Sequence, residues 1–150
     1  MSLLPRVLVA EDDDLLRRVL RDELTDAGFD VTVAVDGADA VERARTAGPF
    51  DVLVFDERLP RLSGSRAVAA LRLAGVAAPA VIMSGELLPG TEPGSQGFLR
   101  KPFLIHDLIA ALWTALRCES LVEPGLSVAG STPGASGKRE EHWRERPGTR

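Results

Sequence analysis

Short apolar runs alternate with segments of helical periodicity over most of this 150-residue chain. Strands are predicted over four short, mostly apolar runs: residues 7–10, 51–55, 80–83 and 97–100. Residues 7–10 are apolar at every position, which is typical of a strand buried on both faces of a parallel sheet. Residues 31–35 instead alternate valine with Thr32 and Ala34, which predicts a strand nearer the edge of the sheet. The pattern therefore predicts five strands.

The segments between these runs repeat apolar residues at helical spacing. Residues 15–27 form the clearest case, with Asp13 or Asp14 as the expected N-cap and Gly28 as the expected stop. Further helices are predicted over residues 38–47, with Asp36 as the cap, and over residues 65–74 and 105–117. Residues 86–96 contain two prolines and two glycines, which favours a loop or a single turn over a full helix.

Repeated strand–helix units imply parallel strands joined by right-handed crossovers. We therefore expect a doubly wound α/β fold with a five-stranded parallel sheet in the order 2-1-3-4-5. This is the flavodoxin-like order, here with the fourth helix short or missing. Residues 1–118 are predicted to form this domain. Residues 119–150 are rich in Gly, Ser and Pro and then in mixed charge, which predicts a disordered tail without an output module.

Composition narrows the functional classes. The net charge of −4 argues against a nucleic-acid-binding protein, which usually carries a basic footprint. Cys118 is the single cysteine, so an intrachain disulfide and a thiolate metal cluster are excluded. No apolar run approaches the roughly 18 residues that a membrane span needs, and the first residues lack the features of a signal peptide. We expect a soluble cytoplasmic protein that binds neither nucleic acid nor membrane.

Polar residues stand where the apolar runs end. Glu11 and Asp12 follow the first run, and Asp56, Ser84 and Lys101 follow the third, fourth and fifth. The carboxyl ends of parallel strands share one edge, where ligands bind. Two carboxylates 4 Å apart repel by about 4 kcal/mol at an effective dielectric near 20, so such a cluster favours a cation with a preference for oxygen, such as Mg²⁺. The edge is predicted to bind Mg²⁺ and a phosphoryl group.

Taken singly, several of these residues have plainer interpretations. Acidic residues after a strand often cap the next helix, and a lone Asp56 or Ser84 is a common loop residue. Lys101 is more informative, because Pro102 restricts it to extended conformations. The Glu11–Asp12 pair and Lys101 are the strongest single indications of a site. All five residues together are stronger evidence for it than any one of them alone.

The motifs resemble the receiver domain of bacterial two-component response regulators over approximately residues 6–117. In chain order they read Leu-Val-Ala-Glu-Asp-Asp, Asp-Val-Leu-Val-Phe-Asp-Glu-Arg-Leu-Pro, Val-Ile-Met-Ser-Gly and Gly-Phe-Leu-Arg-Lys-Pro-Phe. The resemblance implies that Asp56 is the phosphoacceptor. It also implies that Mg²⁺ is held by Glu11, Asp12 and Asp56, with the backbone carbonyl of Arg58.

The resemblance assigns three further roles. Ser84 and Lys101 would bind the phosphoryl oxygens, and Ser84 would shift toward them on activation. Phe98 would be the switch aromatic that swings inward when Ser84 moves. The opposite charges of Arg58 and Glu86, each two residues past a site residue, suggest that they meet over the pocket and tune the lifetime of the phosphoryl group.

The resulting hypothesis is a single-domain switch, a phosphoprotein of a two-component phosphorelay. It would accept a phosphoryl group from a sensor histidine kinase or a histidine phosphotransfer protein and signal by contact with an unidentified protein. Its only catalysis would be transfer to Asp56 and slow autodephosphorylation. A monomer is favoured, because the face beside residues 86–96 departs from the family pattern.

Two alternatives stay open. One is a pseudo-receiver, an interaction module that is never phosphorylated. The other is a phosphatase with an aspartate nucleophile, which is least favoured because Arg58 stands where a second aspartate is normally found.

Overall fold

The computed structural model describes residues 3–86 and 97–121. The elements in these ranges are β1 (Arg6–Ala10), α1 (Asp14–Asp26), β2 (Asp30–Ala34), α2 (Gly37–Thr46), β3 (Val52–Asp56), α3 (Gly64–Leu73), β4 (Ala80–Ser84), β5 (Gly97–Arg100) and α4 (Ile105–Leu121). All strand pairs are parallel, and the sheet has the order β2-β1-β3-β4-β5. The predicted fold class and strand order are confirmed.

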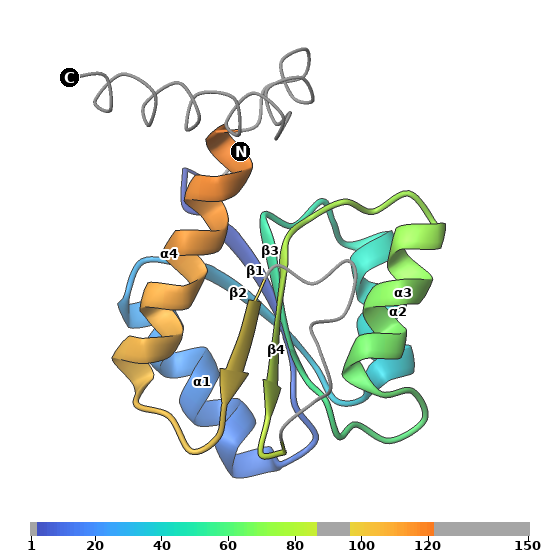
Figure 1. The fold of residues 1–150 in the computed structure, drawn as a ribbon, viewed down its shortest axis with the longest axis horizontal. Coiled ribbons are helices and arrows are strands. Elements are labelled where there is room, and N and C mark those ends of the chain that lie inside the picture. Colours follow the sequence, from blue (N-terminus) through green and yellow to red (C-terminus); the bar gives the residue numbers. More distant parts are fainter. Residues whose placement is uncertain (1–2, 87–96, 122–150) are drawn as a thin grey trace, which may run out of the picture. The chain divides into compact units, whose positions relative to one another are not determined.

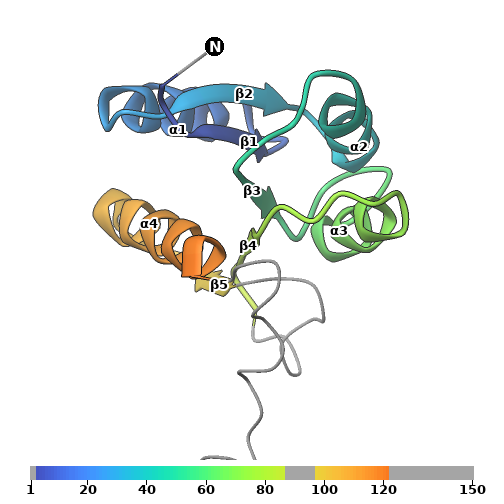
Figure 2. The ribbon, with the colours of Figure 1, turned by 90° about the horizontal axis from the view of Figure 1, so that it is seen from above.

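Two helices cover each face of the sheet. Helices α1 and α4 lie on one face and α2 and α3 on the other (Figures 1 and 2). Successive side chains of a strand point to opposite faces, so Leu8 packs in the core under α2 and α3, whereas Val9 packs under α1 and α4. Strands β1, β3 and β4 are buried almost throughout, which explains their continuous apolar runs.

The ends of the elements follow local chemistry. Asp13, not Asp14, is the N-cap of α1, and its carboxylate accepts a hydrogen bond from the Leu16 N–H at 2.9 Å. Gly28 has a φ of +102°, the left-handed conformation that ends a helix and favours glycine. Asp36 caps α2 as predicted and accepts from the Asp39 N–H at 2.7 Å.

Helix α4 continues to Leu121, four residues past the predicted end at residue 117. The prediction stopped where the composition changes, but the first helix-breaking residue is Pro124. The predicted loop at 86–96 falls almost wholly on residues 87–96, outside the described ranges, as does the predicted tail beyond residue 121. None of the helices in residues 3–86 and 97–121 is long and apolar enough to cross a membrane.

Candidate functional site

Three carboxylates converge at the carboxyl edge of the sheet. Glu11 and Asp12 follow β1, and Asp56 is the last residue of the neighbouring strand β3. One oxygen from each carboxylate lies within 4.8 Å of the others. Glu11 is 1% exposed and Asp56 is 5% exposed, whereas Asp12 is exposed. The cluster is therefore buried on the sheet side and open to solvent on the side of Asp12.

Lys101 supplies the positive charge of the cluster. Its Nζ lies 3.0 Å from Oδ1 of Asp56 and 3.4 Å from Oε1 of Glu11. The Lys101 N–H donates to the carbonyl of Ser84 at 2.8 Å, and the following Lys101–Pro102 peptide bond is cis. One ammonium thus serves two buried carboxylates, which leaves the cluster with excess negative charge.

The pKa values follow this imbalance. Burial raises the pKa of both Glu11 and Asp56, and the charge of a neighbouring carboxylate raises each further. The hydrogen bond and charge of Lys101 lower both values but do not reverse the shift. Burial alone would lower the pKa of Lys101, but its hydrogen bond to Asp56 and the charges of Asp56 and Glu11 raise it overall.

This donor set fits Mg²⁺. A hard divalent cation takes one or two carboxylates together with waters and phosphate oxygens, and three carboxylate oxygens within 4.8 Å offer such a site. A cation here would offset the negative charge that Lys101 leaves uncompensated. Glu11, Asp12 and Asp56 are the residues in the described ranges that would hold it.

Ser84 lies next to this cluster at the end of β4. Asp56 pairs with Met83 in the parallel register, so Ser84 stands one residue further toward the site edge. Ser84 is buried, and its Oγ accepts a hydrogen bond from the Glu86 N–H at 3.0 Å. Phe98 is 38% exposed, so the proposed switch aromatic lies outward in this structure.

Arg58 and Glu86 form an ion pair at the mouth of the site, as their charges and positions suggested. Their side chains are 74% and 58% exposed. Together with Asp56, Gly85 and Lys101 they line a cavity of about 410 Å³. The pair therefore lies across the solvent side of Asp56.

Glu57 is a residue next to the site that the sequence pattern did not single out. Its carboxylate does not enter the acidic cluster but accepts hydrogen bonds from the first turn of α3 at Ser65. The only available signal was an acidic residue six positions before Ser63-Gly64-Ser65 at a predicted helix start, and the neighbouring Asp56 accounted for the motif without it.

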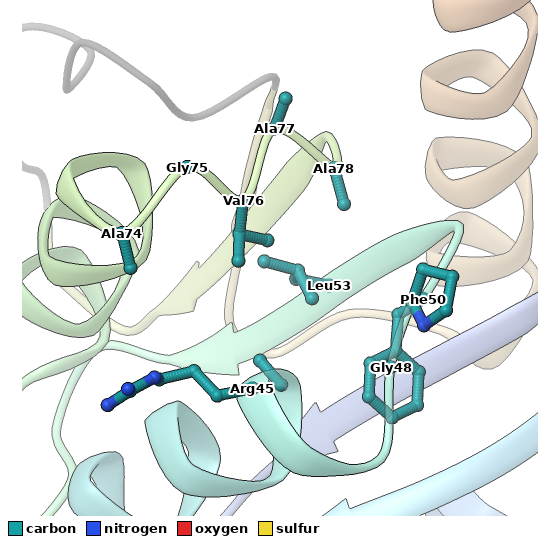
Figure 3. Close-up of a pocket in the computed structure, with 11 residues that line it drawn as sticks. Arg45, Gly48, Phe50, Leu53, Ala74, Gly75, Val76, Ala77 and Ala78 are labelled. Carbon is teal, nitrogen blue, oxygen red and sulfur yellow. The ribbon is translucent and has the colours of Figure 1, made fainter.

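A second cavity, of about 510 Å³, lies at the amino ends of β3 and β4 (Figure 3). The loop from Ala74 to Ala78 borders it on one side, and Leu53 and Phe50 line it beside the end of α2. Arg45 is the charged residue among its described lining residues, which include no carboxylate or hydroxyl group. Its described lining therefore offers no carboxylate or hydroxyl to act as a phosphoacceptor or to hold Mg²⁺.

The family of the chain follows from comparison with known proteins. The family model of the response regulator receiver domain matches residues 7–113, and the chain belongs to this family. Among solved structures, the Francisella response regulator 1452 receiver domain is 33% identical with a TM-score of 0.69, covering 77% of this chain and 98% of that one. The chemotaxis response regulator CheY4 of Vibrio cholerae is 30% identical with a TM-score of 0.70, covering 75% of this chain and 99% of that one.

Curated relatives are longer. The transcriptional regulatory protein PrrA of Mycobacterium leprae is 36% identical over 118 residues, which cover 75% of this chain and 50% of PrrA. The response regulator MprA of Mycobacterium avium is 33% identical over 129 residues, which cover 83% of this chain and 56% of MprA. The chain spans about half the length of the curated relatives it matches.

Proposed function

We propose that this receiver domain is a phosphorylation-activated switch in which Asp56 accepts a phosphoryl group in the presence of Mg²⁺. The donor would be the phosphohistidine of a sensor histidine kinase or of a histidine phosphotransfer protein. One observation carries the proposal. The Asp56 carboxylate lines an open cavity, 3.0 Å from a lysine ammonium and within 4.8 Å of two further carboxylates.

The protein contributes mainly positioning and charge stabilisation to this reaction. An oxygen of Asp56 would form the new bond to phosphorus as the bond from phosphorus to the histidine nitrogen breaks, and the imidazole leaves. Mg²⁺, when bound, neutralises charge on the phosphoryl oxygens. Lys101 already contacts Asp56 and is placed to pair with the same oxygens.

The switch would begin at Ser84. Phosphorylation adds about −1.5 to −2 charges and three acceptor oxygens at Asp56. The Ser84 hydroxyl now bonds to the backbone of Glu86, so it must change partner to reach those oxygens. We propose that Phe98, now outward, moves into the space that Ser84 leaves.

We propose that the domain both receives and transmits its signal by contact with other proteins. Leu15 and Val19 on α1, and Leu104 before α4, are large apolar side chains that are exposed. Exposed apolar side chains are available for contact with a partner protein. With a net charge of −4, we expect contact with another protein in the cytoplasm, and not with nucleic acid.

A direct test is incubation with acetyl phosphate and Mg²⁺, followed by intact mass measurement. We expect a gain of one phosphoryl group that is absent in Asp56→Ala and present in the control Glu42→Gln, which alters an exposed carboxylate on α2. If wild type gains no mass from acetyl phosphate or from a kinase, the chain is a pseudo-receiver and the proposal is wrong.

We further propose that the Arg58–Glu86 pair slows loss of the phosphoryl group by restricting water at the cavity mouth. An exposed ion pair contributes about 0.2–1 kcal/mol. Arg58→Ala or Glu86→Ala should therefore speed autodephosphorylation by about 1.4- to 5-fold, and the charge swap Arg58→Glu with Glu86→Arg should restore it partly. Unchanged rates in both single variants would contradict this role.

A further inference from the structure

Glu57 follows the phosphoacceptor directly, yet its side chain binds helix α3. The Ser65 N–H donates to Oε1 of Glu57 at 2.9 Å. The Ser65 hydroxyl lies 2.7 Å from Oε1 and 2.9 Å from Oε2. Both residues are half-buried. The carboxylate is thus held by the first turn of a helix, where a negative charge is also favoured by the helix dipole.

The backbone of Glu57 is held as firmly as its side chain. Its N–H donates to the carbonyl of Met83 on β4 at 2.8 Å, and its carbonyl accepts from the Gly64 N–H at 3.1 Å. Helix α3 approaches so closely that a Cβ on Gly64 would lie 2.4 Å from the carbonyl oxygen of Asp56. Residue 57 is therefore fixed between a central strand and the start of α3.

This clamp bears on the site through the next residue. Arg58 lines the same cavity as Asp56, and its backbone is one of the groups that favour the charged form of the Asp56 carboxyl. Because Arg58 is the next residue, the position of its backbone depends on how firmly Glu57 is held. We propose that Glu57 is a positioning residue for the phosphoryl site: its carboxylate, tied to Ser65, holds the Arg58 backbone against Asp56. This inference rests on the proposed function for its chemistry.

Helix α3 does not need the contact between Glu57 and Ser65 in order to begin. Ser63 is the N-cap of α3, and its Oγ accepts from the Arg66 N–H at 3.3 Å. A helix with its own cap gains stability from the Glu57 contacts, but it does not need them to start. Ser63 therefore provides a matched control, because Ser63→Ala weakens the same helix end without touching residue 57.

The test compares Glu57→Leu, Glu57→Gln, Ser65→Ala and Ser63→Ala in the full chain. Mg²⁺ affinity is measured by calorimetry, the acetyl phosphate reaction by mass at saturating Mg²⁺, and stability by thermal unfolding. Loss of charge-assisted hydrogen bonds predicts that Glu57→Leu weakens Mg²⁺ binding and slows phosphorylation by about tenfold each. Glu57→Gln keeps an acceptor for Ser65 and should recover most of both. Ser65→Ala should lose about threefold, because one donor remains.

The control separates positioning from stability. Ser63→Ala should lower the melting temperature while leaving Mg²⁺ affinity and phosphorylation rate at wild-type values. The inference is overturned if Glu57→Leu and Ser65→Ala both match wild type in these two measurements, or if Ser63→Ala impairs them as much as Glu57→Leu. A wild-type chain that takes up no phosphoryl group would instead refute the proposed function, and the Mg²⁺ titration would still test Glu57.

Discussion

Asp56→Asn should make the domain more stable, although Asp56 is the residue on which the proposed function depends. The substitution keeps the shape of the side chain and removes its charge. Taking the limit of 4.8 Å between their nearest oxygens as the separation, and a dielectric near 20, each neighbouring carboxylate repels Asp56 by about 3.5 kcal/mol, so two contribute about 7 kcal/mol. Lys101 at 3.0 Å returns about 5.5 kcal/mol on the same basis. The surplus is about 1.5 kcal/mol. Burial of the charge, which is the largest cause of the raised pKa of Asp56, disfavours the ionised carboxylate in the same direction.

Chemical unfolding at pH 7.5 in EDTA measures this difference. We expect Asp56→Asn to raise the free energy of unfolding by about 1–2 kcal/mol. Excess Mg²⁺ should reduce this difference in free energy of unfolding, because it binds and stabilises the folded wild type. The control Glu42→Gln should stay within about 0.5 kcal/mol of wild type, since it alters an exposed side chain. If Asp56→Asn is less stable than wild type in EDTA, the electrostatic reasoning fails.

Three further outcomes can be measured on the same material. Because the pKa of Asp56 is raised on folding, the advantage of Asp56→Asn should be absent below the ordinary aspartate pKa of about 3.9. It should grow as pH rises, because the unfolded carboxylate ionises before the folded one, and level off once both are ionised; an advantage independent of pH would contradict this. Gly64→Ala places a Cβ 2.4 Å from the Asp56 carbonyl and should cost about 2–3 kcal/mol in unfolding experiments, with slower phosphorylation by acetyl phosphate. Gly28→Ala, at a φ of +102° with no atom within 4 Å of the new Cβ, should cost about 1–2 kcal/mol and leave the phosphorylation rate unchanged. Equal phosphorylation rates in the two glycine variants would argue against close packing of α3 as a determinant of the site.

Much of the fold could be predicted because its signals are local. Continuous apolar runs predicted the buried strands β1, β3 and β4, and valine alternation predicted that β2 lies at an edge. Capping chemistry placed the start of α2 at Asp36. The end of α4 was wrong by four residues, because a change in composition is weaker evidence for a helix end than a proline.

The candidate site was predicted from strand ends alone. Parallel strands must bring their carboxyl ends to one edge, so the sequence by itself determined that Asp56, Ser84 and Lys101 would lie near Glu11 and Asp12. The expectation that Arg58 meets Glu86 depended on the same rule and is confirmed.

Tertiary structure alone decided how those residues are paired. Glu11 and Lys101 are 90 positions apart, and only the packed sheet sets their distance of 3.4 Å and the burial that raises the pKa of Glu11. Asp56 and Glu57 are adjacent acids that the sequence does not distinguish, yet one lines the cavity and the other holds α3. Their difference arises from the close approach of a helix to a strand end, which depends on packing between segments and leaves no periodic signal in the chain.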